Sequence, residues 1–255
     1  MEVEYKFLYP GGLDHQTTMD IIGALDMSSE THVLSIAFEH ISTKYLDSAK
    51  GILRNSRIAL RERLENSEFF SNNDLDCKFI NQDLPAIEEE SWQKFCVEVK
   101  NQLENQSVSY DKHIFSFKWG GSAEDGLHKR SEVEFETDRG SIDFSRLAPE
   151  IHRLYKEADK EGIVTLFTTM VRRIKVLIRF NDSDIEVCID KGFLVKDEEV
   201  SDISKEHILS EIELELNHGN EDDLKSVADC LSKKFNLTPN EVSKFQRGLN
   251  FYYGN

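Results

Sequence analysis

Hydrophobic and polar residues alternate along much of this chain, which is the pattern of β-strands that present one apolar face and one polar face. The first such stretch is Glu2–Phe7, and longer extended stretches follow at His32–Tyr45 and Ile58–Leu64. Turn-forming residues, such as those of the loop Gly120–Gly126 and the turn Asn181–Asp184, separate neighbouring stretches and favour an antiparallel sheet. The same alternation predicts further strands at His113–Trp119, Lys129–Thr137, Val164–Phe180, Ile185–Ile189 and Ser210–Leu216.

Apolar residues recur at helical spacing in other segments. One helix is expected over Asp14–Leu25, a second over Asp143–Ala158 and a third beginning near Glu221. A last helix is expected to begin at Thr238. There the order Thr-Pro-Asn-Glu gives a capping hydroxyl, a Pro in the first turn and a Glu three residues after the Thr.

The segment Asn66–Lys112 differs from the rest of the chain. It is polar and aperiodic at its start and has a helical pattern around Ser91–Leu103. We interpret it as an insertion in a surface loop. Because the remaining sequence shows no internal repeat and no interdomain linker, residues 1–255 are expected to form a single domain.

The polar faces of the predicted strands carry charges that are sorted by sign. A single strand of this kind is typical of a sheet with one solvated face. Several in one chain change the interpretation, because three carboxylates in line repel one another unless cations offset them. Divalent metals with hard oxygen ligands, Mg²⁺ or Mn²⁺, suit the carboxylate rows, and a phosphate chain suits the basic pairs. The rows are Arg61 with Arg63, Arg130 with Glu132, Glu134 and Glu136, Arg173 with Lys175, Glu186 with Asp190, and Glu211 with Glu213 and Glu215.

A closed antiparallel barrel with a polar lumen, covered outside by helices, is the geometry that brings all these charged faces together. Unpaired charges in such a lumen are costly, so the lumen is expected to hold water, ions or a substrate.

The residues also resemble a known family. MEVEYKF at the N-terminus resembles the ExExK motif of the CYTH superfamily, the triphosphate tunnel metalloenzymes. YLDSAKGILRNSRIALRER resembles the family's Y-D-T…L…ALR-R segment. GLHKRSEVE resembles the turn and strand of its bacterial inorganic triphosphatase branch. CIDKG, SEIELEL and EVSKFQRG complete a resemblance that covers nearly the whole chain outside residues 66–112.

This resemblance implies an α+β fold in which helices flank an eight-stranded antiparallel β-tunnel, a closed barrel with a polar lumen. It implies that Mg²⁺ or Mn²⁺ is bound by Glu2, Glu4, Glu211, Glu213 and Glu215. It implies that phosphate is bound by Lys6, Arg61, Arg63, Lys118, Arg130, Arg173 and Lys175. Catalytic roles fall to Asp190, Glu213, Glu215 and Lys244. The segment 66–112 makes the register near Lys118 ambiguous, so Lys100 competes with it for a place in the tunnel.

The leading functional interpretation is a metal-dependent inorganic triphosphatase that hydrolyses tripolyphosphate to pyrophosphate and phosphate. One alternative is a class IV adenylyl cyclase that forms cyclic AMP from ATP. Another is a module that binds polyphosphate without catalysis, which the two full carboxylate rows disfavour. A small triphosphate is the expected partner, and the protein is expected to be a monomer or a homodimer.

Charge and composition narrow the remaining classes. The chain has 31 Lys and Arg against 48 Asp and Glu, a net charge of −17, which disfavours non-specific binding to nucleic acid. No run of about 18 apolar residues predicts a membrane-spanning helix. The N-terminus lacks the basic and apolar regions of a secretory signal. The cysteines lie far apart without a CxxC pair, which fits buried, reduced thiols in a cytoplasmic protein: Cys77, Cys96, Cys188 and Cys230.

Overall fold

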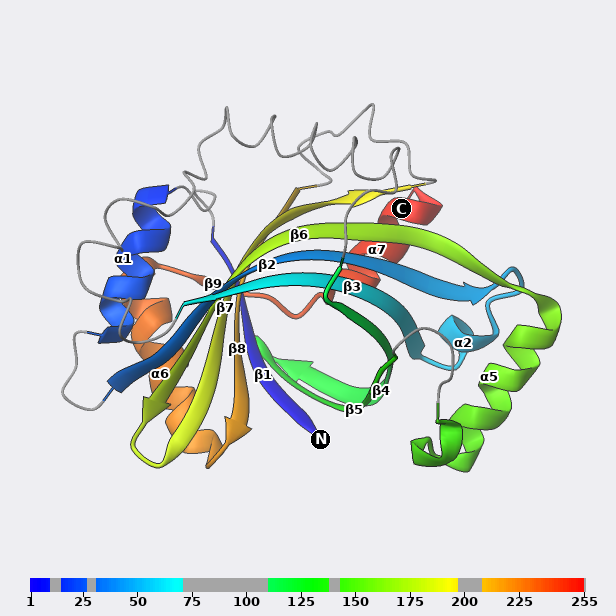
Figure 1. Cartoon of the computed structure of the whole chain (residues 1–255), viewed down its shortest axis with the longest axis horizontal. Coiled ribbons are helices and arrows are strands. Elements are labelled where there is room, and N and C mark those ends of the chain that lie inside the picture. The colour runs from blue at the N-terminus through cyan, green and yellow to red at the C-terminus, as the bar shows by residue number, and fades with distance from the viewer. Residues whose placement is uncertain (10–14, 27–30, 71–109, 138–142, 197–207, 255) are drawn as a thin grey trace.

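The computed structural model describes residues 1–9, 15–26, 31–70, 110–137, 143–196 and 208–254. Its main feature is a single antiparallel sheet that closes on itself (Figure 1). Neighbouring strands follow the order β5-β4-β3-β2-β6-β7-β8-β1, and pairing of β1 with β5 joins the two ends. The predicted closed eight-stranded tunnel is therefore confirmed. Its strands are β1 (Glu2–Leu8), β2 (Thr31–Ser48), β3 (Ile58–Phe70), β4 (Lys112–Glu124), β5 (Leu127–Glu136), β6 (Ile163–Phe180), β7 (Ser183–Val195) and β8 (Ile208–His218).

The strand register places the charged faces on the inside. In the β1–β8 ladder, Glu4 lies opposite Glu215 and Lys6 opposite Glu213. In the β1–β5 ladder, Arg130 lies opposite Glu2. Directly paired residues point to the same side of a sheet, so each closed ladder adds charged side chains to one shared lumen. The alternate residues between them are apolar and form the outer face.

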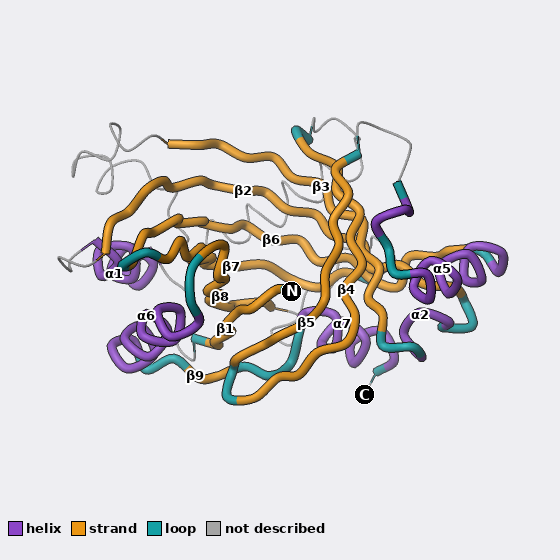
Figure 2. The backbone as a smooth tube through the Cα atoms, turned by 90° about the horizontal axis from the view of Figure 1, so that it is seen from below, coloured by secondary structure: helices purple, strands orange, loops and turns teal. Residues whose placement is uncertain are grey.

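Helices cover this outer face at two places, seen at the left and right of Figure 1. Helices α1 (His15–Asp26) and α6 (Glu221–Phe235) pack against β1, β6, β7 and β8, where Ile21, Ile178 and Leu224 are fully buried. Helices α2 (Ile52–Asn55) and α5 (Pro149–Glu161) cover β3, β4 and β5. Figure 2 shows the same arrangement from below, with both helix groups outside the strands.

Helix α7 (Lys244–Tyr253) is placed differently, because it packs on residues of the lumen face. The Tyr45 ring stacks on Phe167 of β6 at 4.5 Å and on Phe245 of α7 at 5.6 Å between ring centroids. Gly248 is needed at this contact, because a Cβ atom there would lie 1.9 Å from Cε2 of Phe167. Helix α7 therefore packs against lumen-facing side chains of β2 and β6.

The predicted start of the last helix is wrong. Thr238 does not cap a helix; Thr238–Pro239 form the short strand β9 beside β1. Helix α7 begins at Lys244, and the Ser243 side chain accepts a hydrogen bond from Gln246 N at 3.2 Å. The capping pattern at Thr238 is local, whereas pairing with β1 is a tertiary contact that the pattern does not contain.

The other predicted elements are found with altered ends. The helix expected from Asp143 begins at Pro149, after a 3₁₀ turn at Phe144–Arg146. Strand β3 continues to Phe70 and β4 begins at Lys112, so the expected insertion overlaps the barrel at both ends. The loop Gly120–Gly126 is shorter than expected, because β4 runs through most of it to Glu124. Residues 91–103, for which a helix was expected, lie outside the described residues.

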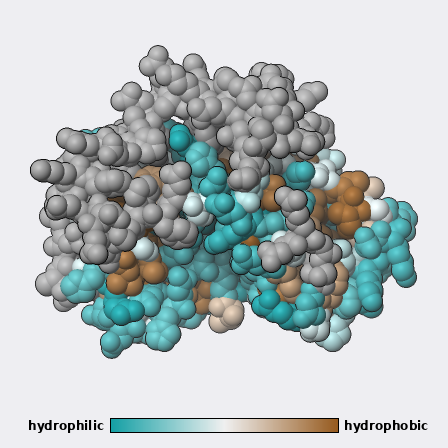
Figure 3. Space-filling model, in the orientation of Figure 1, coloured by the Kyte–Doolittle hydropathy of each residue, from teal (hydrophilic) through white to brown (hydrophobic). Residues whose placement is uncertain are grey.

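The described part of the face shown in Figure 3 is largely hydrophilic, with hydrophobic patches between the hydrophilic regions. None of the helices in the described ranges combines the length and the apolar character that a membrane crossing requires.

Candidate functional site: a charge-lined tunnel

The lumen contains a cavity of about 690 Å³ lined by side chains from every strand of the barrel and from α7. All seven residues of the predicted phosphate cradle line it: Lys6, Arg61, Arg63, Lys118, Arg130, Arg173 and Lys175. The structure thus brings Lys118 to the lumen, while the competing Lys100 lies outside the described residues. Four of the five predicted metal ligands and all the predicted catalytic residues also line the cavity.

Glu213 is the centre of one cluster in this cavity. Its carboxylate is 2.8 Å from Lys244 Nζ and 3.0 Å from an Arg173 Nη, and it also accepts a hydrogen bond from Lys6. Asp190 binds the Arg173 guanidinium through both oxygens, at 2.7 and 2.8 Å. Burial alone would raise the pKa of Glu213, but Lys244, Lys6 and Arg173 together hold it well below its usual range. Glu213 is therefore ionised and already surrounded by cations.

A second cluster lies between β3, β4 and β5. Arg61 contacts Ser116 Oγ and Glu132, both at 2.7 Å, and Arg63 contacts Glu134 at 3.1 Å. Lys118 bridges Glu132, at 2.8 Å, to Glu2 of β1, at 2.7 Å. Burial, together with the neighbouring Arg61 and Arg130, lowers the pKa of Lys118. These strands therefore present basic side chains to the lumen, and the carboxylates of Glu132 and Glu134 on β5 form ion pairs with them.

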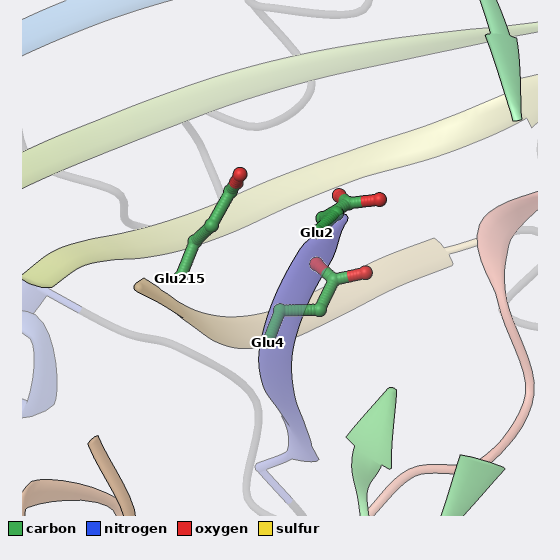
Figure 4. Close-up of side chains that lie close together, drawn as sticks. All are labelled: Glu2, Glu4 and Glu215. Carbon is green, nitrogen blue, oxygen red and sulfur yellow. The ribbon is translucent and has the colours of Figure 1, made fainter. Parts of the chain in front are cut away.

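The carboxylates of Glu2, Glu4 and Glu215 form a third group. One oxygen from each lies within 4.8 Å of the others. Figure 4 shows Glu2 and Glu4 on β1 and Glu215 on the neighbouring β8. Among the described residues, Glu215 makes no hydrogen bond or ion pair, and its burial, with Glu2 close by, raises its pKa to about 7. Glu2 is stabilised as an anion by Lys118 and Arg130.

This third group fits a divalent cation. Three carboxylate oxygens within ligand reach of one centre are the hard donors that Mg²⁺ and Mn²⁺ prefer. Glu215 is partly buried and unpaired among the described residues, so its ionised form favours a cation from outside the chain. Of the predicted ligands, Glu2, Glu4 and Glu215 are brought together, whereas Glu213 lies among the cations described above.

Glu211, also predicted as a metal ligand, is placed elsewhere. It is fully buried and is not among the residues that line the cavity. Its two oxygens contact Lys244 at 2.9 Å and Arg247 at 2.8 Å.

Several cavity residues were not assigned roles from the sequence. Glu132 and Glu134 were recognised as a charged row, but their pairing with Arg61 and Arg63 depends on the β3–β4–β5 register. The ion pair of Glu39 with Lys175 across the β2–β6 pair was missed as well, although alternation at Glu39–Ile41–Thr43 is visible in the sequence. Arg247, which lies outside the cavity lining, was given no role either: it contacts Glu211 of β8 from a helix, and strand alternation does not predict such a contact.

The lining as a whole is balanced in charge. It contains eleven acidic side chains and eleven basic ones. Most of the central basic groups are already engaged with a carboxylate in this structure. A bound anion would have to replace those carboxylates, or bring cations of its own.

The fold and the site define a class of protein: a closed antiparallel β-tunnel. Its lumen combines a cluster of carboxylates suited to a metal ion with a basic surface suited to an anion. The chain belongs to the CYTH family, because the CYTH domain model matches residues 1–249.

Two relatives illustrate the similarity. The chain is 29% identical over 140 residues to the inorganic triphosphatase of Haemophilus influenzae, a match that covers 52% of this chain and 36% of that protein. The chain therefore spans only about a third of that relative. Its fold is similar to that of HpAC1 from Hippeastrum, described as an adenylyl cyclase candidate with a dominant triphosphatase activity. That match has a TM-score of 0.52 and 15% identity, and it covers 100% of this chain and 97% of that one.

Proposed function

We propose that this protein is a metal-dependent triphosphatase that hydrolyses tripolyphosphate to pyrophosphate and phosphate. The observation that carries the proposal is the charge-balanced lumen. A short, highly charged anion accompanied by divalent cations matches both halves of the lining at once, whereas a bare anion matches only one.

The basic residues have the chemistry needed to hold a phosphate chain. Arg61, Arg63 and Arg173 offer planar guanidinium groups that bind phosphate oxygens in pairs, and they line the cavity from β3 and β6, the two strands that flank β2. Their present partners, such as Glu132 and Asp190, keep them ionised and oriented before a substrate enters. Positioning and charge neutralisation of this kind make up most of the catalysis of phosphoryl transfer.

Glu2, Glu4 and Glu215 would hold the metal. When bound, the ion would supply Lewis-acid polarisation of a phosphoryl oxygen and would acidify water. The protein's own contribution is the fixed position of the three carboxylates on two paired strands. The relation to an inorganic triphosphatase supports this function at the level of the family.

A nucleotide cyclase is the second candidate. The cavity lining includes Phe245 and Leu249 of α7 and Trp119 of β4, apolar groups against which a base could stack. The HpAC1 description, which combines a cyclase name with a triphosphatase activity, makes this comparison necessary.

One product assay separates these possibilities. The purified protein is incubated with tripolyphosphate and with ATP in parallel, each with Mg²⁺ or Mn²⁺, and phosphate, pyrophosphate and cyclic AMP are measured. We expect phosphate and pyrophosphate in equal amounts from tripolyphosphate. Cyclic AMP as the main product, with tripolyphosphate untouched, would show a cyclase. Binding of tripolyphosphate without any turnover would show a binding module.

A further inference from the structure

Lys244 is the one cavity-lining residue of α7 that carries a charge within the described residues. Its ammonium lies 2.8 Å from Glu213, 2.9 Å from Asp190 and 2.9 Å from Glu211. The contact with Glu213 is a hydrogen bond, whereas those with Asp190 and Glu211 are ion pairs, so three buried carboxylates together restrict the position of the ammonium. A lysine side chain is otherwise a flexible stem with large rotamer freedom.

Glu211 differs from Asp190 and Glu213 in that its carboxylate is hydrogen-bonded to Arg247. Its Oε1 accepts a hydrogen bond from Arg247 Nη1 at 2.8 Å. The same guanidinium donates through Nη2 to the carbonyl oxygen of Ile208, the first residue of β8, at 2.8 Å. A chain of contacts thus runs from the β8 backbone through Arg247 and Glu211 to Lys244. Neither Arg247 nor Glu211 is among the residues that line the cavity.

Helix α7, which carries Lys244 and Arg247, is also held to the barrel by other contacts. Gly248 lies directly against Phe167, and Phe245 packs on Tyr45. The Ser243 cap fixes the first turn of α7. Loss of the Arg247 side chain would therefore leave α7 in place and change chiefly the position of Glu211, and with it that of Lys244.

We propose that Arg247 and Glu211 are positioning residues that place the Lys244 ammonium at the cavity, and that Glu211 is not a metal ligand. The proposal rests on the proposed function, since it assigns Lys244 to the triphosphate site. Without Arg247, the Glu211 carboxylate keeps its charge but loses the hydrogen bond that holds its Oε1 in place. Lys244 follows it and loses its fixed position between Asp190 and Glu213.

The first test compares Arg247→Gln with Arg153→Gln. Arg153 makes an exposed ion pair with Glu157 on α5, far from the lumen lining, so it controls for the loss of an arginine. We expect Arg247→Gln to lower kcat/KM for tripolyphosphate at least about tenfold with little change in melting temperature, and Arg247→Lys to restore part of it. Arg153→Gln should match the wild type. Wild-type kcat/KM in Arg247→Gln would overturn the proposal.

A double mutant separates positioning from a general structural role. If Arg247 acts through Lys244, adding Arg247→Gln to Lys244→Met should change kcat/KM by less than about twofold. Effects that multiply in the double mutant would mean that Arg247 acts independently of Lys244, and the proposal would be wrong.

The metal dependence separates the two roles of Glu211. We expect Glu211→Gln to reduce kcat/KM as Arg247→Gln does, with a half-saturating Mg²⁺ concentration within about twofold of the wild type. Glu215→Gln should raise that concentration. An equal rise in Glu211→Gln would make Glu211 a metal ligand and overturn the proposal.

A chemical readout works even if the wild type proves inactive, which would refute the proposed function alone. Acetic anhydride labelling followed by mass spectrometry measures the reactivity of each lysine. Lys244 should label slowly in the wild type and at least about fivefold faster in Arg247→Gln, while the exposed Lys50 should not change. Equal labelling of Lys244 in both proteins would show that Arg247 does not fix its position.

Discussion

Glu213 and Glu215 point into the same lumen from the same strand, two residues apart, yet their surroundings are opposite. Glu213 contacts Lys6, Arg173 and Lys244, and these cations hold its pKa well below the usual range against the effect of burial. Glu215 has no ion pair among the described residues, and burial together with Glu2 raises its pKa to about 7.

The difference teaches where this protein supplies its own counter-charge and where it does not. At Glu213 the cations come from β1, β6 and α7, so the carboxylate organises protein groups. At Glu215 the nearest charged neighbours include Glu2 and Glu4, so the position favours a cation from outside. Identical side chains on one strand therefore point to two different functions.

Removing the metal should have the largest effect, and it tests whether the environment of Glu215 serves a metal ion. We expect a chelator to abolish hydrolysis of tripolyphosphate, because the Glu2–Glu4–Glu215 group then lacks its cation, and Mg²⁺ or Mn²⁺ to restore it. Phosphate release with and without chelator is the measurement. Full activity in chelator would leave the acidic group without a metal role.

Glu213→Gln tests the role of the carboxylate that is paired with protein cations. The substitution keeps the shape but leaves Lys6, Arg173 and Lys244 close together without their shared anion, and uncompensated buried charges are costly. We expect kcat to fall about 10- to 100-fold, the scale of effect seen when a supporting partner in such a site is lost. Glu157→Gln, an exposed change on α5, is the matched control. A loss below about threefold would contradict a central role for Glu213.

The raised pKa of Glu215 predicts an effect on stability that depends on pH. Its pKa lies near 4.5 in the unfolded chain and near 7 in the folded protein, so the folded state binds the extra proton between these values. Stability from this group is present below pH 4.5 and is lost as the pH rises through 7.

Glu215→Gln removes this penalty. At pH 8 in chelator, we expect the variant to be more stable than the wild type by about 2 kcal/mol, somewhat less than the full shift implies because the group is partly solvated. At about pH 4, below the unfolded pKa, the two should be nearly equal. Urea unfolding at both pH values measures this, and Mg²⁺ should then stabilise the wild type more than the variant. A wild type that is the more stable at pH 8 in chelator would refute the pKa assignment.

The smallest expected effect concerns substrate choice. A short linear triphosphate can place every oxygen against a cation, whereas ATP must also accommodate adenosine beside the apolar groups of the lining. We expect kcat/KM for tripolyphosphate to exceed that for ATP at least about tenfold, a difference of about 1.4 kcal/mol. Pyrophosphate and long polyphosphate should be poorer still. Equal values for ATP would show that these apolar groups bind the base.

The sequence predicted the barrel and most of the cavity lining because a two-residue period directly determines which face a side chain occupies. Arg61 and Arg63 on one strand, or Glu213 and Glu215 on another, needed only that rule once the sheet was closed. The difference between Glu213 and Glu215 was not predictable, since it depends on which cations the neighbouring strands and α7 bring within reach.

Contacts between a helix and a strand were the least predictable. The local capping pattern predicted that α7 starts at Thr238, and Arg247, although it lies within the EVSKFQRG segment, was given no role. Both depend on where β9 and α7 lie against the barrel. Glu211 was grouped with Glu213 and Glu215 because all three share the strand period, but the period alone does not show that Glu211 lies beyond the cavity.

The balanced lining has a consequence for the kinetics of encounter. Because the lumen residues cancel one another, the chain's net charge of −17 is carried outside the cavity. A free polyanion diffusing toward the tunnel mouth is therefore repelled until it is close, which is the reverse of electrostatic steering. Added salt screens that repulsion, so association should speed up as ionic strength rises, and an anion that arrives with its cations already bound meets the lower barrier.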